Sequence, residues 1–94
     1  MPYSEDDKFN ISYMISSLYF DTDYVDKQFQ AVMADTLDAP ELKSLIQEME
    51  EFVSQLEALT QSVTDDVALG IYRSSVRVGR DAVSALERHY LSMV

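Results

Sequence analysis

The chain of 94 residues lacks cysteine and tryptophan and contains only two glycines, two prolines and one histidine. Without cysteine there can be no disulfide framework, no thiolate metal site and no cysteine nucleophile. The scarcity of glycine and proline, with almost no alternation of β-branched residues, favours an all-α fold. A chain of this length is expected to form one helical domain, residues 1–94.

Long apolar segments are also absent, since no uninterrupted run approaches the roughly 20 residues that cross a bilayer. The N-terminal segment MPYSEDDKF carries acidic residues where a secretory signal peptide carries basic ones. We therefore expect a cytoplasmic protein that does not bind membranes.

Basic residues are few, because Lys and Arg number 7 against 17 Asp and Glu, which gives a net charge of -10. Such a chain repels nucleic-acid phosphates, so we expect no nucleic-acid partner and a preference for basic protein partners. The charge is uneven. Residues 1–66 carry 15 acidic and 3 basic side chains, a net charge of -12, whereas residues 67–94 carry 2 acidic side chains and 4 arginines, a net charge of +2.

The clearest helical pattern covers residues 40–63. Its apolar residues recur in alternating steps of three and four, a coiled-coil-like heptad spacing that predicts one seam of an amphipathic helix. They are Leu42, Leu45, Met49, Phe52, Leu56, Leu59 and Val63. Asp38 with Glu41 forms a capping-box pattern, and Pro40 suits the first turn. We expect the other segments to pack on this helix.

Residues 9–37 also show helical spacing, with two interpretations. One seven-residue phase joins Ile11, Ile15, Leu18, Val25, Phe29 and Val32, and this unbroken phase favours a single long helix. However, Asp21-Thr22-Asp23 is a good N-cap signal, which indicates two helices with a break near residue 22. Residues 1–8 are either a frayed tail or a first turn capped by Ser4.

The last helix is predicted over residues 65–91, after a turn near Ser62–Asp66 in which Thr64 or Ser62 is the expected cap. Its seam holds Leu69, Tyr72, Val76, Gly79, Val83, Leu86, Tyr90 and Met93, with a second stripe at Ile71, Val78, Ala82 and Ala85. Gly79 on the seam predicts a close crossing with another helix of the chain.

Together the segments 9–37, 40–63 and 65–91 predict a small antiparallel bundle of three long helices, or four if the first breaks. The same lengths would also suit a helical hairpin that completes its core by oligomerisation.

No catalytic or metal-binding motif is present. A diiron bundle needs Glu-x-x-His, but the only histidine is His89, and Leu86 stands three residues before it. A calcium loop starting at Asp21 would need glycine and glutamate where Asp26 and Val32 stand. We therefore expect a non-enzymatic protein without cofactor or metal, with His89 exposed or stabilising the helix dipole near the C-terminus.

Two sets of residues are candidates for a protein interface. An aromatic stripe beside the apolar seam comprises Phe9, Tyr13, Phe20 and Tyr24, and an arginine stripe on the last helix comprises Arg73, Arg77, Arg80 and Arg88. The aromatic stripe would otherwise belong to the core of the bundle. The arginines would otherwise pair within the chain, with Glu48, Glu51 or the aspartates of 21–26.

These features favour a non-enzymatic protein–protein interaction module that acts through helix faces and self-associates as a homo-oligomer. An alternative is an acidic inhibitor or antitoxin-like protein that masks a basic partner surface. The acidic face for that role would comprise Glu48, Glu50, Glu51 and Glu57, together with the N-terminal aspartates.

A third hypothesis comes from a resemblance. The Ala39-Pro40 turn between helices, with the runs Tyr72-Arg73 and Val76-Arg77-Val78, resembles in general form the needle subunits of type III secretion systems and their small helical chaperones. This chain departs from that form because its second helix is followed by an extra one. The resemblance implies a secretion-system subunit or chaperone, and no functional residues are carried over from it.

Overall fold

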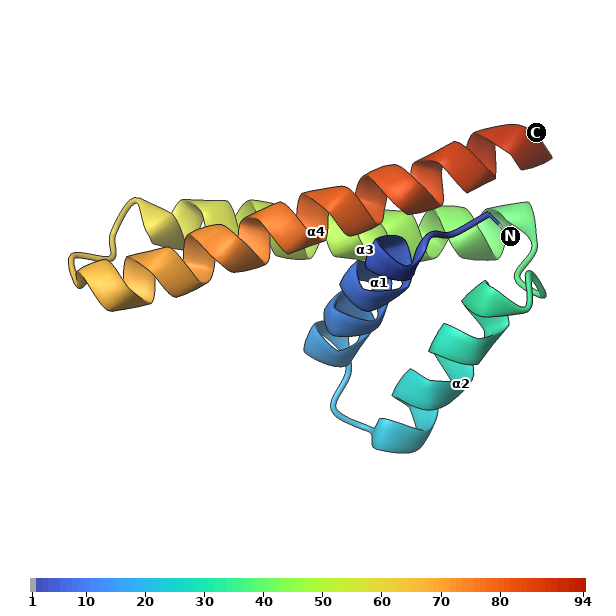
Figure 1. Ribbon diagram of the computed structural model, residues 1–94, viewed down its shortest axis with the longest axis horizontal. Helices are drawn as coiled ribbons and strands as arrows, with labels where there is room; N and C mark the ends of the chain where they lie inside the picture. Colours follow the sequence, from blue (N-terminus) through green and yellow to red (C-terminus); the bar gives the residue numbers. More distant parts are fainter. Residues whose placement is uncertain (1) are drawn as a thin grey trace.

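Four α-helices make up the regular structure of residues 2–94, the part of the chain that the computed structural model describes. They are α1 (Glu5–Leu18), α2 (Thr22–Met33), α3 (Ala39–Thr60) and α4 (Asp66–Met93). The long helices α3 and α4 form an antiparallel hairpin, and the shorter pair α1 and α2 lies beside the half of it that holds both chain termini (Figure 1). The molecule extends 42 × 27 × 23 Å. The predicted all-α bundle is confirmed.

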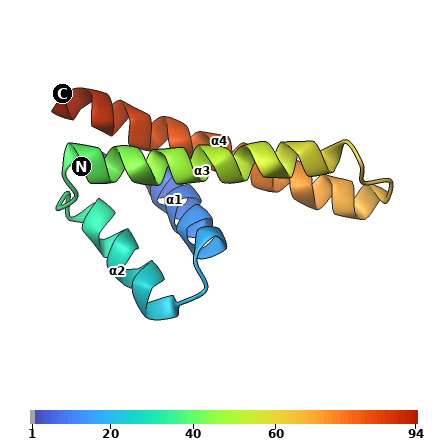
Figure 2. The same cartoon turned by 180° about the vertical axis from the view of Figure 1, so that it is seen from behind.

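The first segment is two helices, so the single helix expected over residues 9–37 is wrong. Tyr19 leaves the helix in an extended conformation, and Asp21 starts the next one. The Asp21 Oδ1 atom accepts hydrogen bonds from the backbone N–H groups of Asp23 (2.9 Å) and Tyr24 (3.3 Å). The chain then turns back, and α2 packs against α1, where it buries Val32 (Figure 2). The seven-residue spacing of the apolar side chains thus continues across a turn at which the helical backbone stops.

Helix α1 begins at Glu5, earlier than the predicted residue 9, because Ser4 caps it. The Ser4 hydroxyl accepts from the Asp7 backbone N–H, and the Asp7 carboxylate accepts from the Ser4 N–H, each at 3.1 Å. This reciprocal arrangement satisfies two donors that would otherwise lack partners. For residues 2–8 the structure therefore shows a first turn capped by Ser4, the second of the two alternatives. Met1 lies outside the described residues.

A tight turn joins α2 to α3. Asp35 adopts a left-handed conformation with φ 58°, and the N–H of Thr36 donates to the Ala31 carbonyl at 3.0 Å, which closes the end of α2. The predicted capping box then starts α3. The Asp38 carboxylate accepts from the Glu41 N–H at 2.9 Å, while Glu41 accepts from the Asp38 N–H at 3.0 Å.

The turn between α3 and α4 lies where the seam loses phase, but its cap differs from the prediction. Asp65, and neither Thr64 nor Ser62, accepts from the backbone N–H of Ala68 at 3.0 Å. The Ser62 hydroxyl instead donates to the Leu59 carbonyl at the end of α3. A carboxylate at the cap also carries the charge that the N-terminus of a helix favours.

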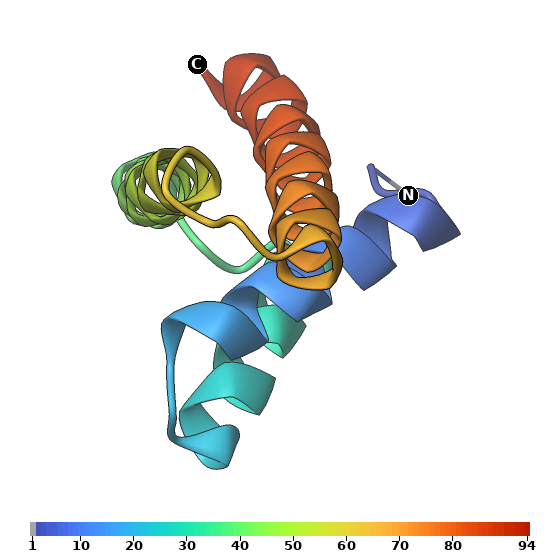
Figure 3. The same cartoon turned by 90° about the vertical axis from the view of Figure 1, so that its left-hand side faces the viewer.

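The core lies where α1 crosses α3 and α4 (Figure 3). Its most deeply buried large side chains come from all three of these helices. They are Ile11, Met14 and Ile15 of α1, Leu45 and Met49 of α3, and Leu86 of α4. Of the predicted α3 seam, Leu42, Leu45, Met49 and Leu56 are buried, and Ile46 and Val53 are buried beside it.

The predicted close crossing at Gly79 is confirmed. A Cβ atom added at Gly79 would lie 2.5 Å from Val53 Cγ2 and 3.2 Å from Met14 Cε, so α3 and α1 both approach the α4 backbone at this point. Ala82 and Ala85, which follow on the same helix, are 0 % and 1 % exposed. Small residues on α4 thus allow three helices to share one core.

Helices α1 and α2 leave much of the other half of the hairpin uncovered, the half that contains the turn between α3 and α4 (Figure 1). Apolar side chains there remain in solvent, including Leu59 at 45 %, Val67 at 71 % and Ile71 at 60 % exposure. We refer to this part, residues 52–78, as the projecting half of the hairpin.

The two glycines of α4 predict opposite effects of the same substitution. Gly79→Ala forces a methyl group against Val53, and we expect it to lower the free energy of unfolding by about 1–3 kcal/mol. At Gly70 no atom lies within 4 Å of the added Cβ, so Gly70→Ala should raise the free energy of unfolding by up to about 1 kcal/mol through helix propensity. Urea unfolding of both variants checks this, and equal shifts in the two midpoints would contradict the close crossing.

Candidate interaction surfaces

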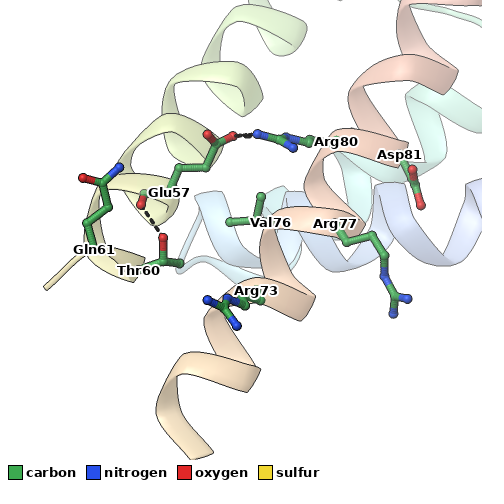
Figure 4. Close-up of a pocket in the computed structure, with 8 residues that line it drawn as sticks. All are labelled: Glu57, Thr60, Gln61, Arg73, Val76, Arg77, Arg80 and Asp81. Atoms are coloured by element: carbon green, nitrogen blue, oxygen red, sulfur yellow. Dashed lines mark hydrogen bonds and ion pairs between the residues drawn. The ribbon is translucent and has the colours of Figure 1, made fainter. Parts of the chain in front are cut away.

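A cleft between α3 and α4 gathers three of the four predicted interface arginines. It has a volume of about 430 Å³ and lies toward the turn that joins the two helices (Figure 4). We call it the arginine cleft. Its lining residues are Glu57, Thr60 and Gln61 of α3 with Arg73, Val76, Arg77, Arg80 and Asp81 of α4.

Among residues 2–94, only one arginine of the cleft forms an ion pair. Arg80 donates to the Glu57 carboxylate from Nε at 3.1 Å and also from Nη2, as Figure 4 shows. This pair is exposed, so it adds little stability. Within residues 2–94, neither Arg73 nor Arg77 has a carboxylate oxygen within 4.0 Å. Two guanidinium groups of the cleft are therefore available to an outside acceptor.

Arg88 is separate from the other three arginines. Its Nη2 donates to the Asp7 carboxylate at 3.0 Å and so ties α4 to the capped start of α1. The acids that pair with arginine are thus Glu57 and Asp7, and none of the expected partners Glu48, Glu51 or 21–26 does so in the described residues. The arginine stripe read from the sequence is divided between two places in the fold.

The aromatic stripe is divided as well, because the chain breaks after Leu18. All four of its side chains are exposed: Phe9 by 65 %, Tyr13 by 41 %, Phe20 by 102 % and Tyr24 by 45 %. The first two lie on α1, Phe20 lies in the connection between α1 and α2, and Tyr24 lies on α2.

Phe9 and Tyr13 line a groove between α1 and α4, which we call the apolar groove. Its other lining residues are Val67, Gly70, Ile71, Ser74, Ser75 and Val78, and none of the lining residues is charged. The Tyr13 hydroxyl lies 3.1 Å from the Ser75 Oγ and links the two helices. The groove is therefore an uncharged strip on a chain of net charge -10.

Phe20 belongs to a different surface, which we call the acidic turn. Its members are Phe20, Asp21, Asp23 and Asp26, and all four side chains are exposed. Within the described residues, no basic group lies within 4.0 Å of the three aspartates. An exposed phenyl ring and three exposed carboxylates thus lie within seven residues of sequence at the start of α2.

Beside the acidic turn, Tyr19 fixes α3 to the connection between α1 and α2. The Tyr19 hydroxyl donates to the Glu48 carboxylate, and the ring packs edge-on against Tyr24 with centroids 4.7 Å apart. Burial raises the pKa of Tyr19 well above its ordinary value, and the hydrogen bond to Glu48 raises it further.

The proposed acidic face of α3 is partly used inside the chain. Glu48 accepts from Tyr19, and Glu57 pairs with Arg80. Glu50 and Glu51 are exposed and form no ion pair with the described residues. Two of the four carboxylates predicted for the acidic face therefore bind residues of their own chain.

A polar cluster near the chain termini was missing from the sequence prediction. His89 Nε2 lies 2.7 Å from Asp35 Oδ1, and the ring of Tyr3 meets His89 edge-on with centroids 5.6 Å apart. The His89 side chain is only 13 % exposed, so of the two alternatives expected for it, exposure to solvent is wrong. The turn after α2 and the residues before α1 both cover it. No spacing signal in the sequence joins these three distant residues.

Tyr3 in this cluster has an unusual hydroxyl. The residue is 5 % exposed, and its Oη is buried with no hydrogen-bond partner among the described residues. Burial raises the pKa of Tyr3 from 10.0 to about 12, with further increases from the Asp35 and Asp7 carboxylates and an opposing effect of Arg88. Ionised Tyr3 would therefore be disfavoured in the folded state.

Neither a metal-ligand cluster nor a membrane-spanning helix is found in residues 2–94. No three His, Asp or Glu side chains there gather as metal ligands would. None of the four helices combines the length and the apolar character of a membrane span. Comparisons of the chain with protein-family models, with curated proteins and with solved structures found no match.

The Tyr3 hydroxyl predicts a pH dependence of stability. Because the pKa of Tyr3 is higher in the folded than in the unfolded state, its contribution is complete below about pH 10 and is lost as the pH rises toward 12. Tyr3→Phe should leave stability at about pH 8 equal or higher, since it removes an unpaired buried hydroxyl. It should also lessen the loss between about pH 8 and about pH 11.

Urea unfolding at the two pH values checks this, with Tyr24→Phe as the matched change at an exposed tyrosine. An alkaline loss of stability that is identical in wild type, Tyr3→Phe and Tyr24→Phe would contradict the role of Tyr3.

Proposed function

We propose that the chain is a non-enzymatic protein-interaction module, which binds protein through the projecting half of its α3–α4 hairpin and has a second copy of itself as partner. The observation that carries this proposal is the arginine cleft. Arg73 and Arg77 stay without a carboxylate partner among residues 2–94 of a chain in which Asp and Glu outnumber Lys and Arg 17 to 7.

The two arginines are well suited to an acidic protein segment. A guanidinium presents a planar set of donors that fits a carboxylate, and such charge-assisted hydrogen bonds are stronger than neutral ones. The cleft opens along the side of two helices, with Val76 buried between Arg73 and Arg80 on α4. An elongated protein segment suits this shape better than a small molecule, which needs enclosure on most sides.

The apolar groove adds support from another side of the same helix. Ile71 stands two residues before Arg73, which places the two side chains roughly 200° apart around α4. Exposed aromatic and aliphatic side chains that gather in one place are typical of protein-binding surfaces. The projecting half thus offers an apolar strip and a basic cleft on different sides of α4.

The glutamates of α3 support this function over that of an acidic inhibitor that acts through α3. A protein that masks a basic surface needs an acidic face that is free to meet it. Here Glu48 and Glu57 are occupied by Tyr19 and Arg80, and only Glu50 and Glu51 of the four are free of such contacts in the described chain.

The first test of the proposed function is the mass in solution. We expect light scattering at micromolar concentration to show an oligomer at about 50 mM salt that dissociates toward about 0.5 M salt, because screening weakens exposed charge pairs. Replacing both free arginines of the cleft, as Arg73→Gln with Arg77→Gln, should lower the mass at low salt to that of the monomer.

The matched control replaces two exposed lysines outside the cleft, Lys27→Gln with Lys43→Gln, which changes the net charge by the same amount. This control should keep the mass of the wild type. A wild type that stays monomeric at every salt and protein concentration would contradict self-association, and equal effects of the two pairs would contradict the cleft.

A further inference from the structure

We infer that the segment that enters the arginine cleft is the acidic turn of a second copy, so that copies join head to tail. The inference rests on the proposed self-association and names the partner segment for the same cleft. It is argued from the chemistry of the two surfaces, from their positions in the fold and from the charge of the chain.

The acidic turn combines one apolar side chain that a partner can bury with neighbouring carboxylates that can bind basic groups. Phe20 is 102 % exposed, so its own chain covers none of the ring. Asp21 uses Oδ1 to cap α2, which leaves its second oxygen free, and Asp23 and Asp26 are exposed on the first two turns of the helix. A fully exposed phenyl ring gains free energy from any contact that removes it from water.

The arginine cleft has apolar surface for the phenyl ring and guanidinium groups for the carboxylates. Val76, 9 % exposed, lies between α3 and α4 with Arg73 and Arg80 near it, and the Arg77 side chain extends from the outer side of α4 (Figure 4). A volume of about 430 Å³ is ample for one phenyl ring, since benzene fits an apolar cavity of about 150 Å³. Guanidinium groups stack on aromatic rings as well as pairing with carboxylates. Phe20 would therefore lie over Val76, with Asp23 and Asp26 toward Arg73 and Arg77.

The contact has to form between copies. The connection between α1 and α2 lies apart from the projecting half of the hairpin in the views of Figures 1, 2 and 3. None of the residues of the acidic turn lines the arginine cleft of its own chain. Because the two surfaces differ, each copy gives its turn to one neighbour and its cleft to another, which produces a ring or an open chain.

The charge of the protein favours this contact over the other contacts that two copies could make. Each copy carries a net charge of -10, so copies repel unless opposite charges meet at the interface. Residues 67–94, with a net charge of +2, are the basic part of the chain, and three of their four arginines line the cleft. The acidic turn brings three carboxylates to them and an apolar ring between.

The experiment mixes two variants, each lacking one side of the contact. The cleft variant is Arg73→Glu with Arg77→Glu, and the turn variant is Phe20→Ala with Asp23→Asn; all four residues are exposed, and Asp21 is kept so that α2 stays capped. Circular dichroism melting is measured first for both variants, alone and beside the wild type. Light scattering at low salt then gives the mass of each variant and of the equimolar mixture.

We expect each variant alone to be a monomer and the mixture to form a one-to-one dimer that grows no further. The cleft variant supplies an intact turn and the turn variant an intact cleft, so a single contact forms. Glu50→Gln with Glu51→Gln, which removes two exposed carboxylates outside the acidic turn, should associate like the wild type.

Three outcomes overturn the inference. If the wild type associates but the mixture remains two monomers, or if the turn variant alone associates like the wild type, the acidic turn is not the partner of the cleft, and the proposed function stands. If the wild type itself is a monomer under the same conditions, the inference fails together with the proposed function.

Discussion

The arrangement of the whole protein depends on one close contact, at Gly79. There the α4 backbone meets Val53 of α3 and Met14 of α1, at a distance that leaves no room for a side chain on α4. This contact brings three helices together at one point and buries Met14, Met49 and Leu86 completely. Helix α2 packs mainly on α1, so its position follows from the same contact.

A consequence of this crossing is that the two halves of the hairpin meet different surroundings. Helix α1 has 14 residues and crosses the hairpin, whereas α3 and α4 continue past it for several turns. Near the chain termini, α1, Tyr3 and the turn at Asp35 close the structure around His89. At the other end Leu59, Val67 and Ile71 remain exposed. The surfaces proposed for a partner lie along this less covered half, and α1 borders one of them with Phe9 and Tyr13.

The same arrangement of helices determines which charged side chains can form ion pairs within the chain. The chain is acidic enough to supply a carboxylate for every arginine, yet the fold places Glu57 beside Arg80 and Asp7 beside Arg88 and leaves Arg73 and Arg77 without one among residues 2–94. The three aspartates of the acidic turn stand elsewhere. Positive and negative groups of one chain are thus held apart by its helices, and the proposed contact between copies would bring them together.

Much of the local structure follows from the sequence alone. The α3 seam, the capping box of Asp38 with Glu41 and the all-α class are visible in residue spacing, because they depend on neighbours within a few positions. Gly79 on the seam of α4 indicated that another helix crosses closely there, but not which helix. The sequence also identified arginines and aromatic residues as interface candidates, but it did not show which of them share a surface.

Only the tertiary structure decided where the chain breaks and which polar groups meet. The apolar phase of residues 9–37 records which side of a segment faces the core, and it is the same whether the backbone continues or turns back at Asp21. The meeting of Tyr3, Asp35 and His89 joins three parts of the chain, as does the pairing of Arg88 with Asp7. Spacing along a sequence fixes contacts between near neighbours, whereas contacts between distant residues depend on how helices cross, and here that crossing is set by the packing around Gly79.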